Sequence, residues 1–530
     1  MKGQDITHLL KSQYPFDISS GSCGFPRPPE NPMLTIPYLG IIIGNFWDRR
    51  LGRTAWFQRD LSWQIVKDKS PRRRAHMKKF MDPESVAIVG ASADPNKGGY
   101  FLVSNLKKKF QERLYPVNPK AKEILGLPAY PDVKALPLPV DLAIVLVAAP
   151  LVPAVIADCG LRGIQRVMIQ SAGFAETGKA GVLIQDQCLS VARQHGIRLW
   201  GPNCMGVVNA HSGMVASFMR TQWEGYLKSG GVSLIVQSGM LSAGFLVQIL
   251  MEGYFGLSKA CSIGNRCDVN ECDLLEYFAQ DPETAVVGLY LESIADVPRF
   301  RNAVSNLKRP VFLLKGGVSE AGARAARSHT ASLAGNALLA EGFFRQLGIH
   351  RARDFLEMVD LIKAQVLWQG RAGGKRVAVV TFSGASGILA ADHLESCGLR
   401  LTNLSPPTVH RLKNIFPHWM EPQNPVDVWP AIERVGREAF HLTLQALVQD
   451  REVDGIFLHL YMDAKMLPEI PHLLEPLQGV KIPVAIWVIG DRGCFRKLRD
   501  HAEGMGIPVY EEISRGAHAL SLMGNTGQAG

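Results

Sequence analysis

Short apolar runs that end in glycine turns, separated by longer amphipathic segments, constrain the fold of this 530-residue chain more than any other feature. The first run is SVAIVGAS (85–92), and similar runs follow at intervals of about 25 to 35 residues. Buried parallel strands form continuous apolar stretches, and the helices that connect them are amphipathic. The alternation therefore predicts βαβ units and an α/β fold.

The predicted strands form three series, separated by short, charged, glycine-containing breaks. These breaks, KSGG (228–231) and RAGGK (371–375), are typical of segments between domains. The openings of the second and third series, VSLIVQSGMLSAG and VAVVTFSGASGIL, resemble each other and indicate two related flavodoxin-like domains. The predicted strands lie within 85–92, 114–120, 140–150, 166–174 and 198–206, then 232–239, 258–265, 285–293 and 309–317, and finally 376–387, 399–405, 453–462, 482–490 and 507–512.

The same breaks define the expected domains. A chain of 530 residues exceeds what one hydrophobic core supports. We expect a Rossmann-like domain followed by two flavodoxin-like, doubly wound domains. The expected regions are a basic, weakly ordered N-terminal extension over 1–76, the Rossmann-like domain over 77–216, and the flavodoxin-like domains over 228–368 and 375–526.

The net charge of +10 does not indicate a nucleic-acid-binding protein, because most of it lies in one tail. Residues 1–80 hold 14 Lys and Arg against 6 Asp and Glu, so the rest of the chain is nearly neutral. The densest part, SPRRRAHMKKF (70–80), fits a solvated linker better than a phosphate-binding patch. Organised sequence begins just after Met77, which makes Met77 an alternative natural start.

Hydropathy and cysteine content favour a cytoplasmic protein. No segment approaches the roughly 20 apolar residues that a membrane-spanning helix needs. The nearest, MLTIPYLGIIIGNFW (33–47), is interrupted by Pro37, Gly40 and Gly44. The nine cysteines are scattered and include no CxxC pair, which favours reduced thiols over a disulfide framework or a metal site. We therefore expect no membrane contact and no bound metal ion in this chain.

Four loops of the first series point to a nucleotide-like ligand. In open α/β sheets, ligands bind beyond the carboxyl ends of the strands. The loop GASADPNKGG (90–99) opens onto a predicted helix whose free amides can receive an anion, although alone it also fits a tight structural turn. The candidate binding residues are Gly90, Ala91 and Ser92 after the first strand, Asn118 and Lys120 after the second, Ala149 and Pro150 after the third, and Ser171 and Gly173 after the fourth.

The second series contains a candidate phosphoryl-transfer site. His329 stands in ARSHTASLAG, after the segment EAGARAARS (320–328), which we expect to be a mobile loop because it offers little side chain to pack. Imidazole is nucleophilic at neutral pH and can accept and release a phosphoryl group. Glu292, at the end of a predicted strand, would fix the ring's tautomer. The amides that would receive the phosphoryl oxygens belong to Ser238, Gly239 and Met240.

Each of these residues also has a structural interpretation. An isolated histidine such as His329 is commonly a surface or capping residue. Glu292 also fits an ordinary ion-pair partner, and Ser238 also fits a helix N-cap. The residues alone leave these alternatives open.

An ordered set of motifs resembles the NDP-forming acyl-CoA synthetases, relatives of succinyl-CoA synthetase. The motifs are MDPESVAIVGAS, VNPK, GPNCMG, VQSG, YLES, SHTASLAG and NPVD. The likeness covers about residues 77 to 525 and leaves 1–76 outside. No single motif carries it, but their common order does.

The resemblance implies roles for the candidate residues. Ser92 with its surrounding loop, Lys120, Ser171, Gly173 and also Asn203 of GPNCMG would contact coenzyme A. In the next domain His329 would be the phosphohistidine, steadied by Glu292, with the VQSG turn cradling the phosphoryl group. The implied reaction converts acyl-CoA, ADP and phosphate into carboxylic acid, CoA and ATP, reversibly, through an acyl phosphate.

Two departures from the family pattern matter. Many relatives have glycine two places after the histidine, where this chain has Ala331. The chain also contains no region that resembles an ATP-grasp domain and no GxxxxGK[ST] loop. The resemblance therefore implies an α subunit, and we expect ADP or ATP and Mg²⁺ to bind a separate ATP-grasp β subunit, in an α2β2 assembly.

Two other functions remain open from the sequence. A CoA-binding regulatory or scaffold protein would have lost turnover, which the joint presence of His329, Glu292 and Ser238 argues against. An NAD-dependent oxidoreductase would place an acidic residue after the second strand, where VNPK has a lysine.

Overall fold

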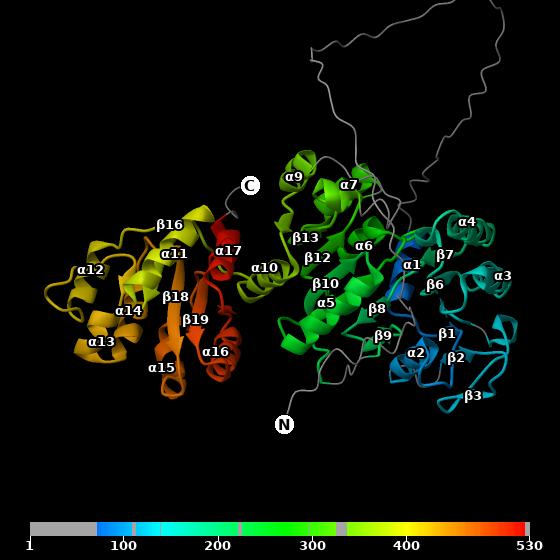
Figure 1. Ribbon diagram of the computed structural model, residues 1–530, viewed down its shortest axis with the longest axis horizontal. Helices are drawn as coiled ribbons and strands as arrows, with labels where there is room; N and C mark the ends of the chain where they lie inside the picture. The colour runs from blue at the N-terminus through cyan, green and yellow to red at the C-terminus, as the bar shows by residue number, and fades with distance from the viewer. Residues whose placement is uncertain are drawn as a thin grey trace, which may run out of the picture. The chain divides into compact units, whose positions relative to one another are not determined.

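The computed structural model describes residues 71–108, 113–137, 139–220, 225–294, 296–324 and 337–524. Within these ranges the chain forms three successive sheets with helices on their faces (Figure 1). This arrangement confirms the predicted α/β class with doubly wound sheets. Among the described helices, none combines the length and apolar character that crossing a membrane requires.

The first sheet has five parallel strands in the order β2-β1-β5-β6-β7. The strands are β1 (Val86–Val89), β2 (Leu114–Val117), β5 (Leu142–Val145), β6 (Arg166–Ile169) and β7 (Arg198–Trp200). The other elements of this part are the hairpin β3 (Glu123–Ile124) and β4 (Leu127–Pro128), the helices α2 (Gly98–Lys107), α3 (Val152–Leu161) and α4 (Lys179–Gln194), and the 3₁₀ turns η2 (Val133–Ala135), η3 (Ala149–Leu151) and η4 (Ala175–Thr177). The strand order reverses between β1 and β5, so a ligand crevice is expected there.

The second sheet has seven strands in the order β14-β13-β12-β10-β11-β8-β9. The strands are β8 (Gly206–Asn209), β9 (Met214–Ala216), β10 (Ser229–Val236), β11 (Leu257–Ser262), β12 (Val286–Leu291), β13 (Val311–Lys315) and β14 (His350–Ala352). Its helices are α5 (Gly239–Glu252), α6 (Glu271–Phe278), α7 (Val297–Leu307), α9 (Ala337–Gln346) and α10 (Phe355–Leu367). Here the order reverses between β10 and β12.

Two features of this region could not be seen in the sequence pattern. Strands β8 and β9 lie inside the range 77–216 expected for the first domain, yet β8 pairs antiparallel with β11 and extends the second sheet. The break KSGG (228–231) is largely strand, because β10 begins at Ser229. A fully buried strand has no alternating polar face, so its sequence shows neither its direction nor its sheet.

The third sheet repeats the flavodoxin-like order, as β16-β15-β18-β19-β20, with β17 pairing β15. Its strands are β15 (Arg376–Thr381), β16 (Arg400–Leu401), β17 (Val426–Asp427), β18 (Gly455–Met462), β19 (Val484–Gly490) and β20 (Val509–Tyr510). Its helices are α11 (Gly384–Ser396), α12 (Pro406–Lys413), α13 (Trp429–Val435), α14 (Glu438–Val448), α15 (Ile470–Leu474), α16 (Arg492–Gly504) and α17 (Ile513–Gly524), with the 3₁₀ turns η5 (Leu467–Glu469) and η6 (Glu475–Leu477). The shared order supports the similarity between the openings of the second and third series.

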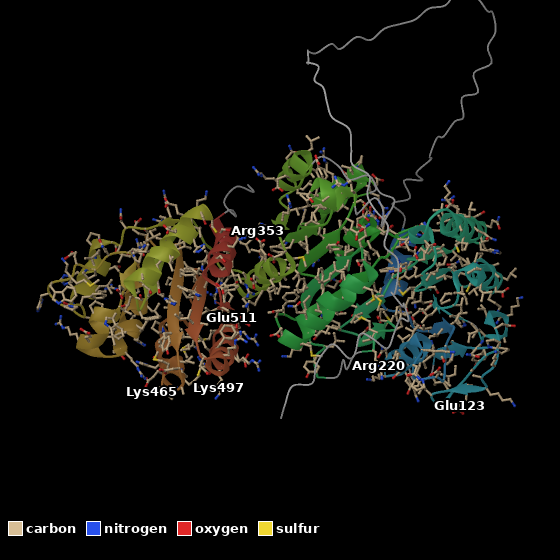
Figure 2. All side chains as sticks on the ribbon, in the orientation of Figure 1. Glu123, Arg220, Arg353, Lys465, Lys497 and Glu511 are labelled. Atoms are coloured by element: carbon tan, nitrogen blue, oxygen red, sulfur yellow. The ribbon has the colours of Figure 1, made fainter. Side chains whose placement is uncertain are left out.

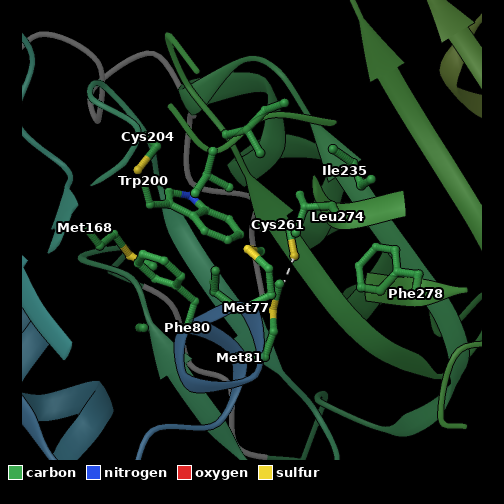
Figure 3. Packing of buried hydrophobic residues seen from close by; sticks show 14 of the residues in the cluster. Met77, Phe80, Met81, Met168, Trp200, Cys204, Ile235, Cys261, Leu274 and Phe278 are labelled. Carbon is green, nitrogen blue, oxygen red and sulfur yellow. Dashed lines mark hydrogen bonds between the residues drawn. The ribbon is translucent and has the colours of Figure 1, made fainter. Parts of the chain in front are cut away.

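Helix α1 (Pro71–Met81) occupies the segment that the charge pattern assigned to a solvated linker, and that prediction is wrong. Met77, Phe80 and Met81 are buried, and Figure 3 shows them packed among residues of the first two sheets. The Phe80 and Trp200 ring centroids are 5.4 Å apart, and the Met81 and Cys261 sulfur atoms are 3.9 Å apart. Burial of these three apolar side chains therefore places the segment in the core, although basic residues surround them in the sequence.

Charged side chains of α10 and its N-terminal flank meet the third part of the chain. Lys363 is 3% exposed and donates to Glu503 Oε1 at 2.7 Å. Arg353, labelled in Figure 2, donates to Glu357 at 2.9 Å, and Glu357 also lies 2.7 Å from His518 of α17. These ion pairs add polar contacts beside the apolar packing of α10 and α17.

Candidate functional site

In the turn between β1 and α2, the backbone passes very close to backbone atoms of neighbouring segments. Gly90 has φ +96°, and a Cβ on it would lie 2.2 Å from the carbonyl oxygen of Leu146. A Cβ on Gly99 would lie 2.1 Å from the carbonyl oxygen of Gly90. Only glycine fits at either position. The first turn of α2 is therefore held against the loops at the point where the strand order reverses, and its N-cap residue, Lys97, makes no side-chain capping bond.

Asn118 joins the loops after β1 and β2. Its Nδ2 donates to the Ala91 carbonyl at 2.8 Å, and its Oδ1 accepts from the Lys120 amide at 2.8 Å. The Ser92 hydroxyl is mostly buried and accepts from the Asp94 amide at 3.0 Å. The Lys120 side chain is exposed beside these loops, where its charge can meet an anionic ligand.

The loops after β5 and β6 complete this edge. Ala149 is buried, Pro150 is exposed, and a Cβ on Gly173 (φ +106°) would lie 3.1 Å from the Ala149 Cβ. The Ser171 hydroxyl is buried without a hydrogen-bond partner among the described residues. Buried hydroxyl groups nearly always have a hydrogen-bond partner, which a ligand or a water molecule could supply here. The edge thus fits a polar, anionic ligand such as coenzyme A.

Asn203 lies where the first edge meets the second. Its amide donates to the Ser171 carbonyl at 2.9 Å, and its own backbone is left-handed, with φ +57°. The Asn203 carbonyl oxygen is 3.4 Å from the position of a Cβ on Gly239, the first residue of α5. The two predicted groups of site residues therefore come close together at Asn203 and Gly239.

At the second edge, Ser238 caps α5. Its Oγ accepts from the Leu241 amide at 3.3 Å, so the N-cap alternative is confirmed for this residue. Gly239 and Met240 form the first turn of the helix, where amides have no acceptor within the helix. The Met240 side chain is 77% exposed. The cap leaves the turn available to an anion and does not exclude the predicted role.

Glu292 is 8% exposed at the end of β12 and is held by residues that the sequence interpretation missed. Gln237 Oε1 accepts from the amides of Glu292 and Ser293 at 2.8 and 3.2 Å. The Tyr290 hydroxyl donates to Glu292 Oε1 at 3.5 Å. Burial and the nearby carboxylate raise the pKa of Tyr290 to about 12, so its hydroxyl stays a donor. Gln237 directly precedes the serine of VQSG, and its position in that motif was the sequence signal that could have identified it.

Lys315 places a cation beside the same residue. Its Nζ donates to the Glu292 carbonyl at 2.6 Å and to the Gly316 carbonyl. Burial lowers the pKa of this ammonium, and the Glu292 carboxylate partly offsets that effect. The second edge therefore combines a carboxylate, an ammonium and the start of a helix.

The loop after β11 bridges the two edges, and no sequence motif indicated it. Asn265 Nδ2 donates to Glu176 Oε2 at 2.6 Å, while Glu176 Oε1 accepts from the Gly173 amide at 2.7 Å. The next residue, Arg266, donates to the Ser293 carbonyl at 2.8 Å and to the Ser293 hydroxyl at 2.6 Å. One polar chain thus runs from the first edge to the backbone next to Glu292.

His329 and the segment 325–336 lie outside the described residues. The pairing of His329 with Glu292 and with the VQSG turn therefore stays a prediction. Residues 320–324 are helical, so the expected loop over 320–328 is wrong for its described part. Alanine and arginine favour helix there, which outweighs the lack of side chain to pack.

Known protein families match both parts of the chain that carry these two edges. Residues 84–210 match the family model of a CoA binding domain, and residues 229–365 match that of a succinyl-CoA ligase like flavodoxin domain. The solved dinucleotide forming acetyl-coenzyme A synthetase 1 of Ca. Korarchaeum cryptofilum, in complex with phosphate and ADP, is 29% identical with a TM-score of 0.76. The match covers 84% of this chain and 96% of that one.

Two curated relatives cover the same part of the chain. The acetate–CoA ligase [ADP-forming] II subunit alpha of Pyrococcus furiosus is 36% identical over 83% of this chain and 96% of its own length. The acetate–CoA ligase [ADP-forming] II of Archaeoglobus fulgidus is 33% identical over 83% of this chain, which spans 65% of that protein. The chain therefore belongs to the family of the ADP-forming acetate–CoA ligases and their alpha subunits.

Proposed function

We propose that this chain is the alpha subunit of an NDP-forming acyl-CoA synthetase, an acid–thiol ligase. It would interconvert acyl-CoA, ADP and phosphate with carboxylic acid, CoA and ATP. The observation that carries the proposal is the contact between the two edges, where the Asn203 carbonyl lies against the Gly239 helix start. A thioester on one edge and a phosphoryl acceptor on the other could then share one intermediate.

The first edge would bind CoA. The open turn of α2 and the exposed Lys120 would meet its phosphates, and the Ser171 hydroxyl would gain the partner that it lacks among the described residues. The residues that we assign to CoA are Gly90, Ala91, Ser92, Asn118, Lys120, Ala149, Pro150, Ser171, Gly173 and Asn203. The expected CoA domain begins at residue 77 and contains the matched range 84–210.

The second edge would carry the phosphoryl group. A phosphate oxygen attacks the thioester carbonyl, and the CoA thiolate leaves and takes up a proton. A ring nitrogen of His329 then attacks the phosphorus of the acyl phosphate, and the carboxylate leaves. Glu292 would hold the ring, and the amides of Ser238, Gly239 and Met240 would receive the phosphoryl oxygens. Transfer from His329 to ADP completes the cycle.

The nucleotide half of the reaction would belong to a partner. We propose a separate ATP-grasp β subunit that binds ADP or ATP with Mg²⁺, in an α2β2 assembly. The proposal is supported by the Pyrococcus furiosus relative, which is named a subunit alpha and is covered almost completely. The eight cysteines within the described residues are free thiols, in keeping with a cytoplasmic location.

The alternative of a CoA-binding regulatory or scaffold protein receives no support from the relatives. Each of the three proteins described above is named a ligase or a synthetase. Membership in their family favours a catalytically active protein over one that has lost its activity.

The first half of the reaction can be tested without the partner. The purified chain is incubated with acetyl-CoA and radiolabelled phosphate, and the protein-bound label is counted. We expect an acid-labile, base-stable label that requires acetyl-CoA and disappears in His329→Ala. The matched control, His410→Ala, removes an exposed histidine of α12 and should keep the label. Equal labelling of His329→Ala and the native chain would refute the assignment.

A further inference from the structure

A second group of titratable side chains lies in the third part of the chain, outside the two sheets that carry the site described above. Helix α14 begins with Glu438 and carries His441 one turn later, so both project from the same side. His472 on α15 and Glu475 just after it repeat this spacing in reverse order. Helices α14 and α15 pack together, which brings the two pairs face to face.

The four side chains meet at short range. His472 Nε2 lies 2.7 Å from Glu438 Oε2, and His472 Nδ1 lies 3.5 Å from Glu475 Oε2. The rings of His441 and His472 stack with centroids 4.4 Å apart and planes 13° apart. One ligand atom from each of Glu438, His441 and His472 can be chosen so that all three lie within 4.8 Å of one another.

A hydrogen bond to the backbone fixes the tautomer of His441. His441 Nδ1 lies 2.9 Å from the His472 carbonyl oxygen, which can only accept, so Nδ1 carries the proton. Its Nε2 then keeps a lone pair. Histidines that bind metals usually donate their other ring N–H to a carbonyl or carboxylate in this way, which fixes the tautomer. His441 is also the least exposed member of the group, at 14%.

We propose that Glu438, His441 and His472 bind a divalent transition-metal ion, with Zn²⁺ as the best match. Two imidazoles and a carboxylate suit Zn²⁺, whereas Mg²⁺ and Ca²⁺ prefer oxygen ligands alone. Glu475 would accept the Nδ1 proton of His472 and leave its Nε2 for the metal. Water would complete a four-coordinate site.

Metal binding would require the side chains to rearrange. The stacked rings of His441 and His472 have planes only 13° apart, so at least one ring must tilt before both can bind one ion. Tetrahedral Zn²⁺ with ligand distances of about 2.1 Å places neighbouring ligand atoms roughly 3.4 Å apart. The contact between Glu438 and His472 at 2.7 Å would open slightly, and the His441 ring would close in. Both Glu438 and His472 are about half exposed, at 44% and 52%, so their side chains can move without disturbing the core.

The ion would link two helices that are joined through a long stretch of chain. Residues 438 and 472 enclose β18 (Gly455–Met462), the fourth strand of its sheet along the chain. A metal that binds only the folded form stabilises it in proportion to its affinity and concentration. The site would thus act on stability of the third part and would leave the chemistry at the first two sheets unchanged.

The test is a zinc titration of the full chain after treatment with a chelator. Isothermal titration calorimetry compares the native chain with His441→Ala, His472→Ala and Glu438→Gln. We expect the native chain to bind one Zn²⁺ more tightly than each variant by about tenfold or more. Zn²⁺ should also raise the midpoint of thermal unfolding in the native chain but not in the variants.

The control is His410→Ala, which removes an exposed histidine of α12 in the same part of the chain and leaves all nine cysteines in place. Far-UV circular dichroism checks that every variant is folded. If an alanine variant does not fold, Glu438→Gln still tests the site, because it keeps the size and shape of the side chain. Equal zinc affinity in the native chain and Glu438→Gln, or an equal loss in His410→Ala, would overturn the proposal. The group would then be a set of surface ion pairs.

Discussion

The side chain of Gln237 holds the backbone of Glu292 through a hydrogen bond of 2.8 Å from the Glu292 amide to Gln237 Oε1. Gln237 is 5% exposed and directly precedes the Ser238 cap of α5. One side chain therefore ties the end of β12 to the start of α5. We regard Gln237 as the positioning residue of the proposed phosphoryl site.

Replacing Gln237 by alanine should loosen this edge. The substitution leaves the buried amides of Glu292 and Ser293 without their acceptor, at a cost of about 1 to 3 kcal/mol in the free energy of unfolding. Urea denaturation measures that cost, and the labelling assay should show slower phosphorylation at unchanged CoA affinity. Gln187→Ala, on the exposed side of α4, serves as the control and should change neither.

A methyl group at Gly99 should damage the CoA edge. In Gly99→Ala the new Cβ would lie 2.1 Å from the Gly90 carbonyl oxygen, so the β1–α2 turn must shift. We expect CoA affinity, measured by calorimetry, to fall by at least about tenfold, because misplaced amides lose their contact with the ligand. Gly244→Ala adds the same methyl group at an exposed position of α5, where no atom lies within 4 Å. It should leave CoA affinity unchanged and leave the free energy of unfolding unchanged or slightly higher. Equal CoA affinity in both variants would contradict the placement of the ligand.

The buried ammonium of Lys259 should make its partner Asp281 hard to replace. Lys259 is 1% exposed and lies 2.8 Å from Asp281 and 2.7 Å from Glu283. Asp281→Asn removes the buried partner and should lower the free energy of unfolding by about 3 kcal/mol. Glu283 is 40% exposed, so Glu283→Gln should cost less than about 1 kcal/mol. Chemical denaturation of both variants gives the comparison, and an equal loss would argue against the buried position of the pair.

Glu357 should make stability depend on acid pH. Burial alone would raise its pKa, but hydrogen bonds from His518 and Arg353 lower it from 4.5 to about 2. The unfolded chain therefore takes up a proton near pH 4.5, while the folded chain resists protonation until about pH 2. The stabilisation is complete above pH 4.5 and is lost as the pH falls toward 2.

Carboxyl chemical shifts during an NMR titration measure the Glu357 pKa directly. In His518→Ala the Glu357 pKa should rise, because the hydrogen bond with His518, which contributes most to lowering it, is gone. In Glu357→Gln the unfolding free energy should depend less steeply on pH than in the native chain. A Glu357 pKa near its ordinary value in the native chain would show that the contact with His518 does not persist in solution.

The sequence was sufficient to predict the strands whose pattern is local. Strands β1, β10 and β15 each follow from an apolar run that ends in a glycine turn, and their positions are confirmed. The edges of the sheets follow too, because parallel strands place their carboxyl ends together. The loops after β10 and β12 were therefore expected at the same edge of one sheet, and the hydrogen bond from Glu292 to Gln237 joins them there.

The rest depends on contacts between distant residues. The bond from Arg266 to Ser293 spans 27 positions, and nothing in the local pattern around Arg266 indicates it. The burial of Met77 and Phe80 was hidden because arginines and lysines dominate the composition of α1. Lys315 looked like an ordinary strand end, since only the folded backbone supplies its carbonyl acceptors.

The antiparallel pairing of β8 with β11 has a practical consequence for anyone who wishes to express the parts of this protein as separate modules. A fragment cut at residue 228 would lose β8 and β9 and would expose the backbone of β11 as a new sheet edge. Such a bare edge invites pairing between molecules and aggregation. A fragment that starts before Gly206 keeps that edge covered and is the better choice for isolating the middle of the chain.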